Sequence, residues 1–427
     1  MRRAKRAVTS MAGSPLKAGS LRSMAAPLAH RDFRRLWGGS LVSYSAQWLQ
    51  QASLGWVVYE LTGSGALVGA VLGVRAIPML ALAPLSGVAA DRYDRSRLLQ
   101  GCQWFAAMVA FAFGVALALD AVPTWVLFAF SLLMGSAVVL DRPARQSAMF
   151  ELVPRDIAMK AIALNVIGNN LARVIAPAVS GFLMAWIGIA GNFLVEGGLC
   201  VAAALLVLSV NFRRREQPRQ ILSASSELAA GLRYAVNNPT IRVLFLMGTS
   251  GFLLLVPATG TLFPIYAKDV YGTGPLGVGM MFTAVGVGGI TGAYVAGALS
   301  RVDRQGLVQL SANFAFVVAM LGLALSPNFA IALVFCVFAG GAEMVMMTSN
   351  ITMMQMAAPD AMRGRITSLS LFYPAMISLG GLITGPLADL YGPGGATLVA
   401  AIACTAATLA LYTCSARLRH LRLSDFK

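Results

Sequence analysis

The stretch GVAADRYDRSR, residues 87–97, places Asp91, Asp94 and three arginines between two long apolar runs. The chain around this stretch is far more apolar than a soluble protein. Of its 427 residues, 58% are hydrophobic and 12% are charged, and the mean hydropathy is +0.73. A soluble domain carries about 25% charged residues. The composition therefore predicts an integral membrane protein, in which this charged stretch is a turn between two membrane spans.

Apolar stretches long enough to cross a bilayer follow one another along the chain. A span needs about 20 mostly apolar residues, and the sequence contains twelve such stretches. They begin near Gly38, Gly65, Leu98, Val122, Ala158, Gly191, Ile241, Pro275, Gly306, Asn328, Ile366 and Gly395. We therefore expect an all-α integral membrane protein of twelve transmembrane helices, which acts in or across the membrane.

The basic charge follows the expected topology. The net charge is +16, which in a soluble protein suggests nucleic acid. With the N-terminus inside, however, all of the 33 Lys and Arg residues fall in cytoplasmic segments except Lys268, Arg75 and Arg173. This is the positive-inside pattern. It predicts a multi-pass protein with both termini cytoplasmic, in contact with membrane lipid and not with nucleic acid.

The two halves of the chain repeat each other. A shift of 209 residues aligns YELTGSGALVG, residues 59–69, with KDVYGTGPLGV, residues 268–278, and AADRYDRSRLL, residues 89–99, with ALSRVDRQGLV, residues 298–308. Parallel repeats about an axis normal to the membrane occur in one large class of transporters. We expect two pseudo-symmetric halves of six helices each. The predicted division is a basic tail at 1–31, a first half at 32–210, a linker at 211–239, a second half at 240–414 and a basic tail at 415–427.

Several motifs resemble those of the major facilitator superfamily. Gly87, Asp91, Arg92, Arg95 and Arg97 resemble the signature of its loop between helices 2 and 3. The stretches at 33–64, 141–154 (DRPARQSAMFELVP), 163–183 and 362–369 look like the bacterial branch of enterobactin exporters and drug-efflux proteins. The resemblance covers the chain after residue 31 and implies the major facilitator fold. It does not define the substrate, because one fold hosts many functions.

The charged turn has a physical role in such a fold. Asp91 is expected at the cytoplasmic end of helix 2, where it would face the N-terminus of helix 11, and the positive end of a helix dipole stabilises a carboxylate. This contact would latch one half to the other. The family's charged network implies that Arg95 pairs with Asp141. The alternative is a solvated turn that only sets topology. The predicted cytoplasmic gate consists of Gly87, Asp91, Arg92, Arg95, Asp141 and Arg304, the last being the repeat of Arg95.

Polar residues form rows on two helices. They recur at three or four residues, which places them on one helical face. The rows are Ser40, Tyr44, Gln47 and Gln51 in helix 1, and Asn165, Asn169 and Arg173 in helix 5. A row of this kind either holds helices together or contacts substrate in the central cavity that the resemblance implies.

Four ionisable residues lie inside predicted spans: Arg75, Arg173, Glu196 and Glu343. A charge at mid-bilayer costs about 2.5–3.5 kcal/mol on the insertion scale, so these residues are candidates for substrate binding or coupling. Glu196 is expected near the outer end of helix 6, in an interfacial or structural role. Arg75 and Arg173 would attract an anionic substrate or pair with a carboxylate. At 1.5 Å per residue, Arg173 and Glu343 lie at a similar depth, roughly 22 Å from the outer surface, so they are expected to meet across the halves.

Motifs for cofactor chemistry are missing from the sequence. The two histidines, His30 and His420, lie in the tails, and the five cysteines lie in predicted helices without ligand spacing, which predicts buried thiols and no metal site. No G-x-x-x-x-G-K-[ST] sequence occurs, which disfavours an intrinsic ATPase. The segment APAVSG, residues 176–181, loosely resembles the antiporter signature, although Ala176 stands where its first Gly is expected.

We therefore expect a monomeric, cofactor-free secondary transporter of a bacterial inner membrane. It would export a small amphipathic compound, siderophore or drug-like, by alternating access coupled to a proton. An importer or facilitator of a small solute is the alternative within the same fold. A polytopic membrane enzyme and a channel are the alternatives from other classes.

Overall fold

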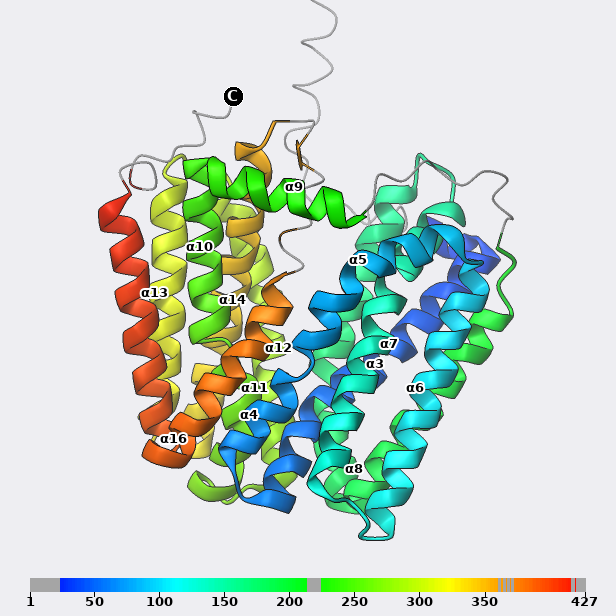
Figure 1. Ribbon diagram of the computed structural model, residues 1–427, viewed down its shortest axis with the longest axis horizontal. Helices are drawn as coiled ribbons and strands as arrows, with labels where there is room; N and C mark the ends of the chain where they lie inside the picture. The colour runs from blue at the N-terminus through cyan, green and yellow to red at the C-terminus, as the bar shows by residue number, and fades with distance from the viewer. Residues whose placement is uncertain are drawn as a thin grey trace, which may run out of the picture.

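The computed structural model describes residues 24–212, 224–359 and 372–415, together with Met362, Arg363, Ile366, Leu369 and Arg419. At residues 83–84, 87–92 and 224–230 it describes the helical backbone without the side chains. The described elements are all helical, and they lie side by side in one bundle (Figure 1). The bundle is all-α, as the composition predicts.

The helices before and after the central linker form two groups. The first contains η1 (Ala26–Ala29), α3 (Arg31–Thr62), α4 (Gly65–Gly73), α5 (Ala76–Arg92), α6 (Arg95–Ala118), α7 (Thr124–Glu151) and α8 (Ala158–Leu208). The second contains α10 (Pro239–Leu254), α11 (Pro257–Ile265), η2 (Tyr266–Val270), α12 (Gly274–Leu299), α13 (Gln305–Ala324), α14 (Phe329–Ala357) and α16 (Phe372–Cys414). Between them α9 (Ala224–Asn237) lies across one end of the bundle (Figure 1). The predicted linker therefore contains a helix that the sequence analysis did not anticipate.

We call the end of the bundle where α9 lies the α9 end (Figure 1). The start of α3 and the end of α16 lie there too, and we call the other end of the bundle the opposite end.

Local sequence explains where several helices begin. The side chain of Ser64 accepts a hydrogen bond from the amide of Leu67 at the start of α4, and Asn328 caps α14 in the same way through Ile331. Such side chains satisfy amides that have no partner within the helix. The predicted starts at Gly65 and Asn328 therefore lie within one residue of the observed ones, and the predicted start at Ala158 is also the observed one, although no side chain caps α8 there.

Nine helices in the described part of the chain are long and apolar enough to cross a membrane. The first, α3, is not among them because its polar row lowers its hydropathy. Two of the nine, α8 with 51 residues and α16 with 43, are interrupted by a glycine with non-helical backbone angles. These glycines are Gly188, with φ 78°, and Gly392, with φ 70°, in a region where a side chain would add strain.

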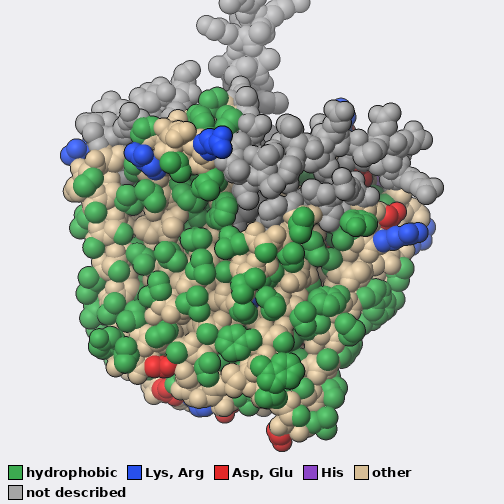
Figure 2. Space-filling model, in the orientation of Figure 1, with side chains coloured by type: hydrophobic (Ala, Val, Ile, Leu, Met, Phe, Trp, Pro, Cys, Tyr) green, Lys and Arg blue, Asp and Glu red, His purple; other side chains and the backbone are tan. Residues whose placement is uncertain are grey.

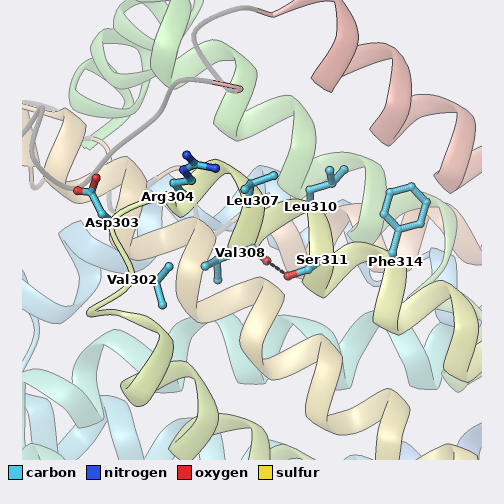
Figure 3. A pocket seen from close by; sticks show the side chains of 8 residues that line it. All are labelled: Val302, Asp303, Arg304, Leu307, Val308, Leu310, Ser311 and Phe314. Atoms are coloured by element: carbon cyan, nitrogen blue, oxygen red, sulfur yellow. Dashed lines mark hydrogen bonds between the residues drawn. The ribbon is translucent and has the colours of Figure 1, made fainter.

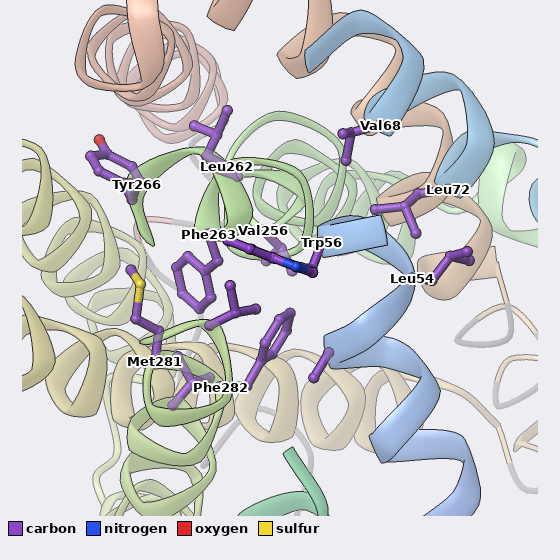
Figure 4. Packing of buried hydrophobic residues seen from close by; sticks show 14 of the residues in the cluster. Leu54, Trp56, Val68, Leu72, Val256, Leu262, Phe263, Tyr266, Met281 and Phe282 are labelled. Atoms are coloured by element: carbon purple, nitrogen blue, oxygen red, sulfur yellow. The ribbon is translucent and has the colours of Figure 1, made fainter. Parts of the chain in front are cut away.

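Side chains from both groups share one apolar core. Trp56 of α3 and Leu72 of α4 lie in the same cluster as Phe263 of α11 and Phe282 of α12 (Figure 4). Deletion of a large buried side chain costs about 3–5 kcal/mol. The two groups are therefore fixed to each other by core packing at this point.

The lateral surface in Figure 2 is mostly hydrophobic, and its charged side chains gather toward the two ends, with Lys and Arg prominent near the α9 end and acidic side chains prominent at the opposite end. Exposed side chains include Trp125 and Trp186, at 68% and 72% exposure. A surface of this kind suits the hydrocarbon core and aromatic belts of a bilayer.

Four of the five cysteines are buried, and Cys414 at the end of α16 is exposed. The prediction of buried thiols is therefore wrong for Cys414, which lies in the last helical turn, where packing ends. Both predicted tails lie largely outside the described residues.

Candidate functional site

The polar rows of α3 and α8 face each other. The hydroxyl of Tyr44 donates to the side-chain oxygen of Asn165 at 3.0 Å, and the indole of Trp48 donates to that of Asn169 at 3.3 Å. These bonds hold the two helices together, which was one of the two roles expected for the rows. All four side chains remain partly accessible. Gln47 in the same row donates to Ser43 at 3.5 Å.

Arg173 of α8 and Glu343 of α14 form an ion pair between the two groups of helices. One guanidinium nitrogen lies 3.3 Å from each carboxylate oxygen, and the side chains are 15% and 13% exposed. The guanidinium also lies over the Trp48 ring, 5.3 Å from its centroid, within the range of a cation–π interaction. The contact predicted from depth is therefore present, while its role in coupling stays a prediction.

Arg75 lies at the break between α4 and α5. It donates to the side-chain oxygen of Gln50 at 2.8 Å and to that of Gln51 at 3.0 Å. Its two nitrogens are therefore bonded to α3 amides and not to a carboxylate. The sequence analysis selected Gln51 but missed Gln50, which lies next to the recognised row and not within it.

A second ion pair is buried inside the first group of helices. Asp141 and Arg145, one helical turn apart on α7, form a bidentate pair at 2.8 Å. Arg145 also donates to Ser40 at 3.1 Å, and Gln103 of α6 donates to Asp141 at 3.1 Å. These four side chains are almost fully buried. The sequence analysis missed Arg145 and Gln103, although the spacing within DRPAR is the spacing of an i, i+4 pair.

The expected pair between Arg95 and Asp141 is wrong. Arg95 forms an ion pair with Glu151, at the end of α7, and donates to the carbonyl of Ser147 at 3.4 Å. Asp141 lies more than two helical turns before Glu151 and has Arg145 on its own helix. Asp141 therefore pairs with Arg145, which lies one turn away on the same helix, and not with Arg95 on α6.

Of the two roles expected for Glu196, interfacial or structural, the interfacial one does not fit its burial. The residue is 1% exposed, and it faces α3, α6 and α7 inside the first group of helices. Glu196 lies eight residues after Gly188 on the second part of α8, which places it about 12 Å from Gly188 along the helix at 1.5 Å per residue.

The predicted gate is only partly described. The side chains of Gly87, Asp91 and Arg92 lie outside the described residues, so the proposed contact of Asp91 is not tested. Arg304 precedes α13 and lines a hollow of about 870 Å³ (Figure 3). The eight described residues that line it belong to α13 and the turn before it and not to the first group of helices.

Contacts between the two groups close the opposite end. Asp389 of α16 accepts hydrogen bonds from the Ser64 hydroxyl and the Ala66 amide, both at 2.9 Å, and from the Gly65 amide. A carboxylate at a helix N-terminus is stabilised by free amides and by the helix dipole. Two further pairs lie at this end: Tyr59 donates to Asp269, and Lys268 pairs with Glu60 at 2.9 Å. The sequence analysis missed all of these residues as functional candidates.

Small residues bring α4 and α16 together beside Asp389, toward the middle of the bundle. A Cβ atom on Gly69 would lie 2.0 Å from the carbonyl oxygen of Gly381, and one on Gly385 would lie 2.3 Å from that of Gly65. Glycines four residues apart on each helix thus allow the backbones to touch, as in other membrane helix pairs. The opposite end is closed by close packing as well as by polar contacts.

Replacement of Asp389 by alanine is expected to loosen this closure. Loss of a hydrogen-bonding partner costs about 1 kcal/mol, which corresponds to about a fivefold shift in the population of the closed end. Ile265 can report this loosening, because it lies 3.0 Å from a Cβ built on Gly65. In a chain that carries Ile265→Cys and Cys414→Ser, the new cysteine should react faster with a maleimide when Asp389 is alanine than when Asp389 is present. Asp389→Asn should have an intermediate effect, since asparagine keeps one acceptor oxygen where the carboxylate has two. Equal labelling rates in Asp389→Ala and the parent would contradict the role of this cap.

Among the described residues, no three His, Cys, Asp or Glu side chains lie close enough together to hold a metal ion.

Comparison with known proteins agrees with this arrangement. The profile of a family described as transmembrane secretion effector matches residues 22–425. The chain is 25% identical to the staphyloferrin A transporter of Staphylococcus aureus, over 90% of this chain and 96% of that protein. It is 26% identical to the multidrug efflux pump Tap of Mycolicibacterium fortuitum, over 79% and 84%, and 26% identical to the enterobactin exporter EntS of Shigella boydii, over 80% and 81%.

The fold is similar to that of solved transporters. The nucleoside transporter NupG superposes with a TM-score of 0.75 at 15% identity, over 90% of this chain and 98% of that chain.

Proposed function

Because this chain belongs to the transmembrane secretion effector family of major facilitator transporters, we propose that it exports a small amphipathic compound by proton-coupled alternating access. Staphyloferrin A transporter, enterobactin exporter and multidrug efflux pump are the names of its relatives. A siderophore or drug-like compound is therefore the substrate class that we propose.

We propose twelve membrane crossings. At 1.5 Å per residue α8 would extend about 76 Å, more than twice the roughly 30 Å hydrocarbon core. We therefore divide α8 at Gly188 and α16 at Gly392 into two crossings each. Residues 32–210 and 240–414 then form halves of six helices, joined by the linker at 211–239. The α9 end, with the tails at 1–31 and 415–427, faces the cytoplasm of a bacterial inner membrane.

The observation that carries the proposed mechanism is the ion pair between Arg173 and Glu343. It joins α8 of one proposed half to α14 of the other at 3.3 Å. Rocking of the halves would part the two side chains, and a carboxylate without a partner in the membrane interior is costly. Glu343 would then take up a proton, and re-formation of the pair would release it.

The substrate is proposed to bind beside this pair. Trp48, Tyr44 and the two asparagines of α8 combine aromatic faces with hydrogen-bonding groups, which suits an amphipathic molecule. Met344 and Met347 of α14 are only partly buried, and methionine adapts to varied apolar ligands. Arg173 would favour an anionic or phenolate group.

The experiment that tests this function is uptake into inverted membrane vesicles. A panel of siderophores and drugs is presented with and without an imposed pH gradient, and empty vesicles are the control. Accumulation that depends on the gradient supports proton-coupled export. Accumulation only in right-side-out vesicles would favour an importer. Equilibration of the substrate without accumulation would favour a facilitator. Conductance far above the transport rate of a carrier would favour a channel, and chemical conversion of a compound without its transport would favour an enzyme.

The latch at the α9 end gives a separate prediction. Asp91→Asn should reduce transport and leave membrane insertion nearly intact, because the carboxylate proposed to face the N-terminus of the helix after residues 359–365 is lost. Ser300 stands at the equivalent position of the second half, where it is exposed and donates to Gly297 of its own helix at 2.7 Å. Ser300→Asn should therefore have little effect. Normal vesicle transport by Asp91→Asn would remove the latch from the mechanism.

A further inference from the structure

A small cavity lies among α3, α6, α7 and α8, away from the pair of Arg173 and Glu343. Its volume is about 30 Å³, and one water needs about 10–15 Å³ by the same kind of measure. Its polar lining consists of Ser43, Gln47, Gln50, Gln103, Asp141 and Glu196. The cavity is therefore large and polar enough to hold a water molecule.

Two buried side chains in this lining have atoms without a hydrogen-bond partner among the described residues. They are the amide nitrogen of Gln50, at 4% exposure, and the Oε2 atom of Glu196, at 1% exposure. A buried polar atom without a partner costs about 1–3 kcal/mol. A water in the cavity would satisfy both, because it can accept from Gln50 and donate to Glu196.

Among the described residues no cation forms an ion pair with Glu196, although Arg75 lies near it and the Nε atom of Arg75 has no hydrogen-bond partner. Arg145 is bound to Asp141 at 2.8 Å, and Arg75 is bound to Gln50 and Gln51. The titratable and charged groups that surround the carboxyl group are Asp141 and Arg145 on α7, Cys102 on α6, Cys200 on α8 and Arg75 between α4 and α5. An ionised carboxylate buried without a partner is far more costly than a neutral one.

We propose that Glu196 and this cavity form a proton-binding site, in which the carboxyl group carries its proton in the present conformation and a water links it to Gln50. The site is separate from Glu343. The Glu343 carboxylate has its counter-ion in this structure, whereas the Glu196 carboxyl does not.

Arg75 is the group that would release this proton. It interacts electrostatically with Glu196, and it stands at the break between α4 and α5, where the two helices can move relative to each other. Gln50 connects the two residues, since its oxygen accepts from Arg75 and its side chain, whose nitrogen has no partner among the described residues, lines the cavity. Movement of Arg75 from Gln50 to Glu196 would ionise the carboxyl group and pass the proton to water. Use of this proton in transport rests on the proposed function, but its presence on Glu196 does not.

Infrared spectroscopy of the purified full-length protein tests the site without any substrate. A protonated carboxyl group has a carbonyl stretching band distinct from that of a carboxylate. We expect such a band at neutral pH, lost in Glu196→Gln and retained in Glu343→Gln. A spectrum in which Glu196→Gln removes no protonated-carboxyl band would overturn the proposal.

The role of Arg75 is tested by a matched pair of glutamine variants. Gln50→Leu removes one acceptor from Arg75 and should eliminate the band at neutral pH, whereas Gln47→Leu, which lines the same cavity without contacting Arg75, should retain it. Arg75→Gln should keep the band at higher pH than in the wild type, which tests the same link if Gln50→Leu does not fold. A band that titrates identically in Arg75→Gln and the wild type would overturn release by Arg75. Failure of pH-driven vesicle transport alone would count against the proposed function and not against this site.

Discussion

Glu343→Gln is expected to abolish accumulation of substrate in response to a pH gradient while leaving substrate exchange between equal pools intact. The carboxyl group is lost, so the residue can no longer bind a proton when the halves part, but the amide is nearly the same size. For a neutral substrate exchanged against one proton, each pH unit supplies about 1.4 kcal/mol, which is about tenfold accumulation. The wild type should approach this ratio in inverted vesicles, and the variant should remain near onefold.

Glu343→Asp is the matched control for this variant. It keeps a carboxyl group but shortens the side chain by one methylene, so pH-driven accumulation should be reduced and not abolished. Exchange between equal pools reports binding and rocking without net coupling, and it should continue in both variants. If Glu343→Gln concentrates substrate as the wild type does, the coupling proton is carried elsewhere, and Glu196 becomes the first candidate.

The contact between Arg173 and Glu343 could be predicted because helix depth follows from residue number. The rise per residue is fixed, and both residues were placed at one depth in helices expected to face each other. Helix starts such as Gly65 and Asn328 were predictable for a similarly local reason, since each lies at or beside a residue whose side chain caps its own helix.

The environments of Glu196 and Asp389 could not be predicted in this way. The burial of Glu196 depends on three other helices that surround its side chain. Asp389 meets amides that lie more than 320 residues away, and neither residue type nor spacing indicates that contact. Asp141 was predicted as the partner of Arg95 from the family's charged network. This prediction overlooked Arg145, which lies four residues from Asp141 on the same helix.

Asp141→Asn is expected to destabilise the protein by about 3–5 kcal/mol, because removal of one partner leaves the other charge buried and uncompensated. Arg145 is 1% exposed, and its remaining hydrogen bond in the structure is to the Ser40 hydroxyl. Gln103 would keep an acceptor, since asparagine retains one oxygen. Thermal and denaturant unfolding of the purified protein in detergent would measure the loss.

The ion pair between Arg95 at the start of α6 and Glu151 at the end of α7 provides the control. Glu151 is 31% exposed and its partner Arg95 is 10% exposed, so water reaches this carboxylate but not Asp141, and pairs that water reaches contribute about 0–1 kcal/mol. Glu151→Gln should therefore change the unfolding free energy little. A loss as large as that of Asp141→Asn would show that general damage to α7, and not burial of an unpaired charge, determines the effect.

Removal of both charges distinguishes the cost of an unpaired arginine from the value of the pair itself. Replacement of a buried ion pair by neutral groups of similar size is often neutral or stabilising, so Asp141→Asn combined with Arg145→Met should recover most of the stability lost in the single variant. The recovery would appear as a coupling energy in a double-mutant cycle. If the double variant is as unstable as Asp141→Asn, the hydrogen bonds to Ser40 and Gln103, and not the two opposite charges, hold α3 and α6 against α7.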